Sequence, residues 1–283
     1  GHGPFSHVLE STIAPGVHHE EISLLIMRKM NHEMNGRLEL AIRIYKDEYE
    51  KRFLHQLVSS QLDMDRLDYL RRDSFYTGVT EGNIGSARII KMLDVKDDHL
   101  VVESKGIYSI ENFLAARRLM YWQVYLHKTS VACEKMINNT LLRAKELAQQ
   151  GTELYVSPAL RYFLYNNITR ETFFSDEHCL DTFIQLDDND IWCALKAWAT
   201  HEDKVLATLS RGLVNRRLFK VEMSTTPFTR QHKTEITQHI CDTLKISKKE
   251  ATYLFCSSTQ EKDMYSADNR PVADTVCRLY TKG

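Results

Sequence analysis

Apolar residues recur every three or four positions along most of this chain, which is the spacing of amphipathic helices. Only five prolines and 11 glycines are available to interrupt these stretches. A first helix is predicted after His19, where Ile22, Leu25 and Ile26 share one face, and it should end near Gly36. The pattern therefore predicts a mainly α-helical protein.

The same spacing predicts the later helices. They cover residues 37–56, 58–72 with a break at Gly78, 109–150 with an interruption near Lys128, 159–165, 191–199 and 204–213. Ser157-Pro158 has the N-cap and first-turn chemistry of a helix start, and Asp187-Asp188-Asn189-Asp190 supplies another. Few loops are left between these elements.

Three short segments alternate apolar and polar residues instead, as strands do. Residues 95–102, divided by Lys96-Asp97-Asp98, predict a small hairpin. Residues 218–222 and 253–256 predict strands in the last part of the chain. We therefore expect a helical body followed by a small mixed α/β appendage from about residue 215.

Charge and composition restrict the partners and the location. The 37 basic and 38 acidic residues nearly cancel, so no overall field favours nucleic acid or an anionic membrane as the main partner. No apolar run approaches the ~18 residues of a membrane span, and no signal peptide opens the chain. The six cysteines show no CxxC spacing, which suits free thiols in a reducing compartment. A cytoplasmic location is predicted.

The first candidate site is the opening Gly-His-Gly-Pro-Phe-Ser-His, whose glycines and proline let the backbone turn sharply. His2 and His7 lie close together there, Glu10 follows three residues later, and His19 opens the next helix. Histidines near a carboxylate can hold a metal, position phosphate or shuttle protons. A tag-like terminus whose histidines have no function fits the same residues.

The second candidate site is a helical stripe in residues 61–73. Asp65, Tyr69, Arg72 and Asp73 fall at i, i+4, i+7 and i+8, so one face carries two carboxylates, a phenol and a guanidinium. A solvated helix with surface ion pairs is the alternative. The stripe is richer than solubility requires, which favours a binding site.

The third candidate site lies on the long helix, where Arg117, Tyr121, Tyr125 and Lys128 share one face. Arginine binds phosphate oxygens through its planar fork, and tyrosine can stack on a base or hydrogen-bond a sugar. Spacing alone favours the alternative, in which the tyrosines are half-buried core residues and Arg117 reaches solvent.

In this order, the motifs resemble the HD-domain deoxynucleotide triphosphohydrolases. The resemblance rests on residues 1–7, His19-Glu20, Asp65 to Asp73, and Arg117 with Tyr125-Leu126-His127-Lys128, and it spans residues 1 to about 130. It implies an HD-type helical bundle at residues 1–150, a helical extension at 151–214 and a small α/β subdomain at 215–283.

The resemblance also implies roles for individual residues. His19 would protonate the leaving 5′ oxygen, with Glu10 where the family usually has an aspartate and with His2 beside the reaction, and Asp65 would bind a divalent metal (Mg, Mn, Fe or Zn). The substrate-binding residues would be His7, Arg66, Tyr69, Asp73, Arg117 and Tyr125. Arg88 and Lys105 match the family's regulatory nucleotide site.

The expected reaction converts a deoxynucleoside triphosphate to deoxynucleoside and triphosphate, in a homo-oligomer. The family's other metal ligands, a histidine and a His-Asp pair, would precede residue 1, so we expect the 283 residues alone to be inactive. Two alternatives stay open. One is an HD phosphohydrolase acting on another nucleotide or phosphoester, and the other is a non-catalytic nucleotide-sensing module.

Overall fold

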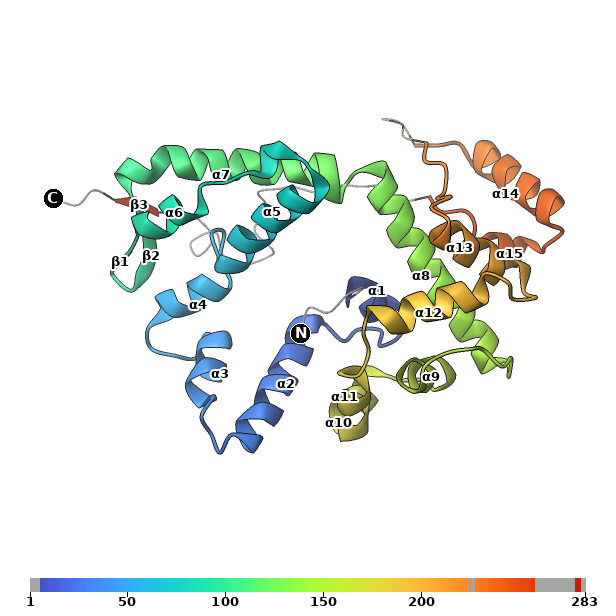
Figure 1. Cartoon of the computed structure of the whole chain (residues 1–283), viewed down its shortest axis with the longest axis horizontal. Coiled ribbons are helices and arrows are strands. Elements are labelled where there is room, and N and C mark those ends of the chain that lie inside the picture. Colours follow the sequence, from blue (N-terminus) through green and yellow to red (C-terminus); the bar gives the residue numbers. More distant parts are fainter. Residues whose placement is uncertain (1–5, 223, 225–226, 258–277, 281–283) are drawn as a thin grey trace. The chain divides into compact units, whose positions relative to one another are not determined.

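The computed structural model describes residues 6–222, 224, 227–257 and 278–280, except for the side chains of 6, 7 and 278–280 (Figure 1). These residues form fifteen α-helices, three strands and short 3-10 and π-helical turns. The predicted mainly α fold is confirmed. Within the described residues, no helix is long and apolar enough to span a membrane.

The chain divides into two compact units, residues 1–26 with 128–259 and residues 27–127 with 260–283. We call them the first and the second unit, and each is described by itself. The expected division into residues 1–150, 151–214 and 215–283 stays a prediction about independently folding domains.

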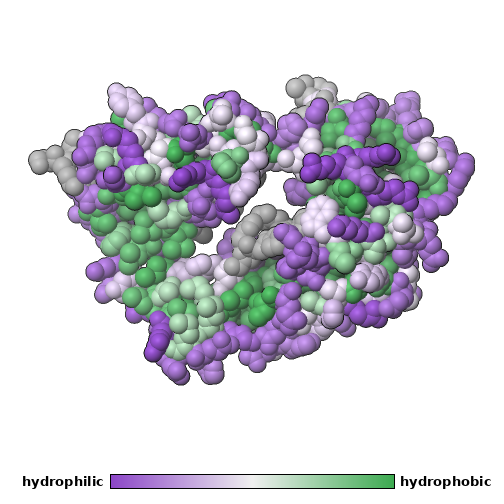
Figure 2. All heavy atoms as spheres, viewed as in Figure 1, coloured by the Kyte–Doolittle hydropathy of each residue, from purple (hydrophilic) through white to green (hydrophobic). Residues whose placement is uncertain are grey.

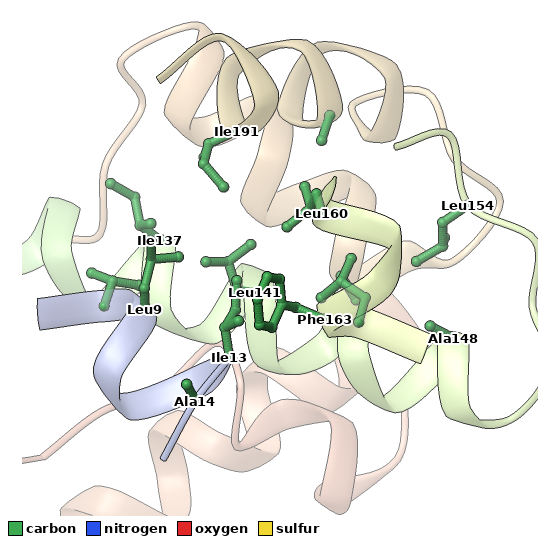
Figure 3. Packing of buried hydrophobic residues seen from close by; sticks show 14 of the residues in the cluster. Leu9, Ile13, Ala14, Ile137, Leu141, Ala148, Leu154, Leu160, Phe163 and Ile191 are labelled. Carbon is green, nitrogen blue, oxygen red and sulfur yellow. The ribbon is translucent and has the colours of Figure 1, made fainter. Parts of the chain in front are cut away.

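The first unit is built on α8 (Lys128–Gln149), against which three helices pack: α1 (Ser6–Thr12), α9 (Pro158–Tyr165) and α13 (Lys204–Val214). The unit also contains the start of α2 (His19–Glu33), α10 (Arg170–Ser175), α11 (Glu177–Phe183), α12 (Asp188–Trp198), α14 (Arg230–Leu244) and α15 (Lys248–Ala251). Its core includes Ile13, Leu141, Leu160 and Phe163, which are all fully or almost fully buried (Figure 3). The apolar spacing noted in the sequence is thus the buried face of these helices.

Side-chain caps set the helix starts of this unit. Ser157 accepts a hydrogen bond from the Leu160 backbone N–H, with Pro158 in the first turn of α9. Asp187 forms a reciprocal capping box with Asp190 at the start of α12. The predicted starts of these two helices are confirmed.

The described part of the second unit contains the end of α2, eight further helical elements and a small sheet. Its α-helices are α3 (Glu39–Tyr45), α4 (Arg52–Val58), α5 (Met64–Thr77), α6 (Ser86–Met92) and α7 (Ile107–Met120), and its 3-10 turns are η1 (Thr80–Gly82) and η2 (Ser104–Gly106). A π-helical turn, η3 (Tyr121–Tyr125), continues α7. α5 lies beside α7 (Figure 1), and Leu67 and Leu70 of α5 share a core with Phe113 and Met120 of α7.

The sheet has the order β1-β2-β3. β1 (Leu93–Lys96) pairs antiparallel with β2 (His99–Glu103), and β2 pairs in parallel with β3 (Arg278–Tyr280). Asp97 and Asp98 connect the hairpin, both with positive φ (50° and 58°), as a type I′ turn requires. The predicted hairpin is confirmed.

Several predicted boundaries were wrong in the second unit. A single helix over residues 37–56 was expected, but α3 ends at Tyr45 and the chain turns at Asp47 (φ 57°) before α4 begins. Val58 ends α4 rather than opening the next helix, because Asp63 caps α5 by accepting from the Arg66 N–H. Gly78, with φ of 72°, ends α5 as predicted.

The long predicted helix, residues 109–150, is interrupted close to the expected place. The π-helical turn ends at Tyr125, and α8 begins at Lys128.

The strands predicted at residues 218–222 and 253–256 are not strands. Residues 218–222 belong to no helix or strand, and Tyr253 and Leu254 lie in a turn after α15. Their apolar side chains, with those of Leu218 and Phe219, pack against the core of the first unit. Alternation here reflects packing on a helical surface. The strand described in this part of the chain is β3.

Apolar side chains also reach the surface of the second unit. Figure 2 shows hydrophobic residues at the surface over α3 and α4, where Leu40 is 50% and Val58 44% exposed. Ile42 is the only buried residue of these two helices. α3 and α4 therefore add little to the core on which α5 and α7 are held.

Candidate functional site

The first unit pairs Glu10 of α1 with His19, the first residue of α2. One carboxylate oxygen, Glu10 Oε1, lies 2.7 Å from His19 Nδ1 and accepts the His19 backbone N–H at 2.9 Å. Both side chains are mostly buried, with 22% of His19 and 17% of Glu10 exposed. Because a carboxylate can only accept, this contact places a proton on Nδ1. Nε2 is then the nitrogen that can exchange a proton with a ligand, and Glu20 Oε1 lies 3.3 Å from it.

Two distant cations hold the loop between α1 and α2. Arg170 of α10 donates to the Gly16 carbonyl at 2.7 Å and forms a two-pronged ion pair with Glu21. The hydrogen bond from Arg170 to the Glu21 carboxylate is the main reason why the pKa of Glu21 is lowered. Lys145 of α8 donates to the carbonyls of Thr12 and Ile13 at 3.1 and 3.3 Å. The geometry of the Glu10–His19 pair therefore depends on α8 and α10.

The other two predicted site residues of this unit cannot be placed in the same way. His2 lies outside the described residues. His7 belongs to α1, but its side chain is outside the description. Their predicted roles at the reaction and at the phosphates stay predictions.

The second unit gathers predicted substrate-binding residues from α5 and from the end of α7. Asp73 of α5 accepts a hydrogen bond of 2.7 Å from the hydroxyl of Tyr125. Tyr69 and Tyr125 meet edge to face with ring centroids 6.0 Å apart, and Tyr121 meets Tyr125 at 5.3 Å. The π-helical hydrogen bond from the Leu126 N–H to the Tyr121 carbonyl, 2.7 Å, sets the spacing of these rings.

Burial keeps both phenols of this cluster protonated. It raises the pKa of Tyr69 to about 12. Burial also raises the pKa of Tyr125, with a second contribution from its hydrogen bond to Asp73. Neither hydroxyl is suited to act as a base near neutral pH, but both can hydrogen-bond a sugar or phosphate.

Two guanidinium groups accompany the phenols. Arg117 donates from Nη1 to Gln61 Oε1 at 2.9 Å and lies over the Tyr121 ring, 5.9 Å from its centroid. Arg66 donates from Nη1 to the Ser60 carbonyl at 2.5 Å and to the Asp63 carboxylate. The Nε atoms of both arginines are buried without a hydrogen-bond partner in the described structure.

Both arginine charges act on one phenol. Arg66 and Arg117 are held by the neighbouring residues Ser60 and Gln61, and the charge of each lowers the pKa of Tyr69 against the larger effect of burial. Two cations and neutral hydroxyls in one place suit a multiply charged anion such as a polyphosphate. The cluster therefore contains five of the predicted substrate-binding residues: Arg66, Tyr69, Asp73, Arg117 and Tyr125.

Asp65, the predicted metal ligand, is exposed in the first turn of α5. Among the residues that the structure describes, no group of three or more His, Cys, Asp or Glu side chains could hold a metal ion. A single carboxylate is too few ligands for a tightly bound divalent cation. The described residues do not by themselves fit a metal centre.

The two predicted regulatory residues lie next to each other. Arg88 of α6 points Nη2 at the carbonyl of Lys105 in η2, at the outer limit of a hydrogen bond (3.5 Å). The Lys105 amine pairs with Glu103 at 2.7 Å. Their adjacency agrees with a shared anion site, and the regulatory role stays a prediction.

Three features of the second unit were not expected from the sequence. Arg72, expected on the binding stripe, instead pairs with Asp68 at 2.7 Å on an exposed face of α5. Asp63, which was not singled out, is buried and binds Arg66. An aspartate just before a helical apolar stripe is typical of an N-cap and could have revealed it. The pairing of Gln61 with Arg117 spans 56 residues and left no local signal.

Comparison with known proteins finds similarity to HD-domain proteins and to a phosphohydrolase. The family described as the HD-associated region matches residues 84–155, which include α6, the hairpin, α7 and α8. A solved phosphohydrolase from Bacteroides thetaiotaomicron is 71% identical with a TM-score of 0.87, over 89% of this chain and 62% of that one.

Curated relatives are more distant. The uncharacterized protein YwfO of Bacillus subtilis is 31% identical over 227 residues, which are 78% of this chain and 50% of that protein. A Dictyostelium discoideum protein named as a deoxynucleoside triphosphate triphosphohydrolase SAMHD1 homolog is 26% identical over 171 residues, 54% of this chain and 33% of its own length. The chain spans half the length of the Bacillus relative and less of the Dictyostelium one.

Proposed function

The chain belongs to the HD-domain phosphohydrolase family, and from this premise we propose that the whole protein hydrolyses deoxynucleoside triphosphates to deoxynucleoside and triphosphate. The observation that supports the proposal is that the short segment Ser60–Asp63 contacts the guanidinium groups of both Arg66 and Arg117, next to the paired rings of Tyr69 and Tyr125. The name of the Dictyostelium relative supports the same substrate class. Nucleotide is thus the proposed partner.

In this proposal the second unit binds the substrate. The guanidinium groups of Arg66 and Arg117 donate to phosphate oxygens, where charge-assisted hydrogen bonds are strongest. Asp73 holds the Tyr125 hydroxyl at 2.7 Å, which fixes one wall of the cluster. Tyr69 and Tyr125 then offer neutral hydroxyls to the sugar or phosphate.

The Glu10–His19 pair is proposed as the general acid. A water oxygen bonds to the α-phosphorus and loses a proton to solvent, while the bond from that phosphorus to the 5′ oxygen breaks. His19 gives its proton to this oxygen and is then protonated again from solvent. Glu10 contributes by holding Nδ1, so that Nε2 is the ring nitrogen left to give up the proton. His2 and His7 belong to the same proposal as phosphate-contacting residues.

A divalent metal is part of the proposal for the whole protein. It would act there as a Lewis acid. Asp65 is proposed as one ligand, and the remaining ligands would have to come from outside the described residues. Three further proposals rest on the resemblance alone: the 283 residues by themselves are inactive, the protein is a homo-oligomer, and it is located in the cytoplasm.

The test is to identify the products formed by the full-length protein. It is incubated with each deoxynucleoside triphosphate and Mn or Mg, and the products are separated by ion exchange. Triphosphate with deoxynucleoside is expected; pyrophosphate or orthophosphate would refute the proposal. A parallel panel of other nucleotides and cyclic dinucleotides separates it from another HD phosphohydrolase, and binding without turnover would indicate a sensing module.

A matched pair of arginine variants tests the binding cluster. Arg117→Ala should raise KM for the nucleotide by about tenfold or more, because a charge-assisted phosphate contact is lost. Arg161→Ala removes an arginine of the first unit that pairs with Glu153 on the surface, and it should leave KM unchanged. Equal kinetics for the two variants would exclude Arg117 from the phosphate site.

A further inference from the structure

A four-residue segment, Ser60–Asp63, contacts both guanidinium groups of the cluster. The Ser60 carbonyl and the Asp63 carboxylate accept from Arg66 Nη1, and Gln61 Oε1 accepts from Arg117 Nη1 at 2.9 Å. Asp63 also accepts the backbone N–H of Ser60 at 3.2 Å and that of Arg66 at 2.8 Å. The segment is thus tied to the start of α5 and has little freedom to move.

The two arginines are held by acceptors of different charge. The Asp63 side chain is only 4% exposed, so its carboxylate neutralises Arg66 at short range. Arg117 is held by a neutral amide, and within the described part of the chain no carboxylate lies within ion-pair distance of it. Its other contact is the face of Tyr121, which does not remove the charge. Arg117 is the uncompensated cation of the cluster.

We propose that Gln61 is a positioning residue that fixes Arg117 without neutralising it, and so tunes the cluster for a polyphosphate. A glutamate at this position could make the same contact with nearly the same shape, but its carboxylate would compensate the charge that the ligand has to meet. An apolar residue would keep the charge and lose the fixed direction of the guanidinium. This inference rests on the proposed function, because it assumes an anionic ligand at Arg117.

The experiment compares Gln61→Glu, Gln61→Leu and the control Gln149→Glu. Gln149, the last residue of α8, is exposed in the first unit, so its variant adds the same charge away from the cluster. Binding of inorganic tripolyphosphate to the full-length protein is measured by calorimetry at several salt concentrations. The thermal midpoint of each variant shows whether it is folded.

Gln61→Glu should weaken tripolyphosphate binding by about tenfold and make the affinity less sensitive to salt, since one net positive charge is lost. Gln61→Leu should also weaken binding, but it should retain the wild-type salt dependence. Gln149→Glu should bind as the wild type does. If Gln61→Glu binds tripolyphosphate like the control, or if both Gln61 variants share one salt dependence, Gln61 has only a structural role.

Turnover separates this inference from the proposed function. In a protein that hydrolyses nucleotides, Gln61→Glu should raise KM about tenfold with kcat within about twofold, because the affected contact is made before the chemical step. If the wild type releases no triphosphate from any nucleotide but the binding results hold, the proposed function fails and the role of Gln61 stands. If the wild type releases triphosphate but Gln61→Glu has the KM of the wild type, the proposed function stands and the proposed role of Gln61 fails.

Discussion

Two tyrosines of the second unit share one buried surface, but their hydroxyls are held differently. Tyr125 donates to Asp73 at 2.7 Å, whereas the charges of Arg66 and Arg117 act on the pKa of Tyr69 and lower it against the effect of burial. In both cases burial is the largest influence on the pKa and raises it. Both phenols therefore stay neutral, so neither of them removes the charge of an arginine.

Tyr69 gives a pH-dependent contribution to stability. Its pKa is about 12 in the folded chain against an ordinary value of 10.0, so the protonated form is favoured by folding. A raised pKa contributes stability that is fully present below the unfolded value and is lost as the pH rises toward the folded one. We expect the free energy of unfolding to fall between about pH 10 and about pH 12, by more in the wild type than in Tyr69→Phe.

Urea denaturation of the two proteins at both ends of this range measures the difference. Tyr125 titrates in both proteins and cancels in the comparison. Identical pH dependence in wild type and Tyr69→Phe would mean that the phenol of Tyr69 is not buried among these groups.

The sequence predicted which residues share a helix face better than it predicted which residues contact each other. The spacing of Tyr69 and Asp73, one helical turn apart, correctly put them on the face that meets Tyr125. The partner of Arg72 was missed, because Asp68 lies four residues earlier on the same helix and competes at close range. Gln61 could not be found at all, since its contact with Arg117 is made by folding and not by local sequence.

Helix packing in the second unit depends on one glycine. A Cβ on Gly82 would lie 2.5 Å from the sulfur of Met120 and 2.8 Å from the Cβ of Ser74. Met120 and Ser74 belong to α7 and α5, and Met120 is completely buried. The absence of a side chain at Gly82 therefore allows η1 to approach both helices that carry the binding cluster.

Gly82→Ala should destabilise the protein by about 1–3 kcal/mol, because the added methyl group forces shifts in a filled core. Gly85→Ala is the matched control, since nothing lies within 4 Å of a Cβ at that position. The comparison needs only the urea midpoints of the two variants. Equal midpoints would show that η1 is not packed against α5 and α7 in this way.

In the first unit, a buried arginine joins three helices. Arg143 of α8 binds Asp203, the N-cap of α13, at 2.6 and 3.2 Å, and also contacts Glu146 and Glu250. Only 9% of the Arg143 side chain is exposed. Such a buried charge is costly when a partner is removed.

Asp203→Asn should destabilise the protein by about 2 kcal/mol, because asparagine can still cap α13 but cannot neutralise Arg143. Glu153→Gln is the control, since Glu153 pairs with Arg161 at the surface with 76% of its side chain exposed. Its unfolding midpoint should not change. A wild-type midpoint for Asp203→Asn would show that the network adds nothing to stability.

The same network predicts acid sensitivity. A hydrogen bond from Lys249, followed by those from Arg143 and Tyr253, lowers the pKa of Glu146 to about 2 from an ordinary value of 4.5. A depressed pKa contributes stability that is present above the unfolded value and is lost as the pH falls toward the folded one. Unfolding monitored by the buried Trp198 should therefore become easier between pH 4.5 and about 2. Stability that is constant over this interval would contradict the described contacts of Glu146.

Elements with side-chain caps or tight turns were the best predicted. Ser157 and Asp187 fix their helix starts through local hydrogen bonds, and Asp97-Asp98 fix the hairpin through left-handed backbone. The two predicted strands near the end of the chain were wrong because alternation alone cannot tell a strand from an extended segment lying on helices. Pairing with another strand depends on the whole fold.

Each of the two units is built from segments that lie far apart in the sequence. The first unit combines residues before 27 with residues after 127, and the strand β3 near the end of the chain pairs with β2. Local sequence patterns do not show which distant segments pack together, so the division into two units was not predicted. The resemblance to HD-domain enzymes, by contrast, used motifs from both units and was confirmed by the comparisons.

Oxygen transfer from labelled water identifies which phosphorus atom of the nucleotide is attacked. Full-length protein is given a deoxynucleoside triphosphate in ¹⁸O-labelled water with Mn or Mg, and both products are analysed by mass spectrometry. Attack at the α-phosphorus predicts one labelled oxygen in the released triphosphate and none in the deoxynucleoside. Label in orthophosphate or pyrophosphate, or in the deoxynucleoside, would contradict the proposed reaction.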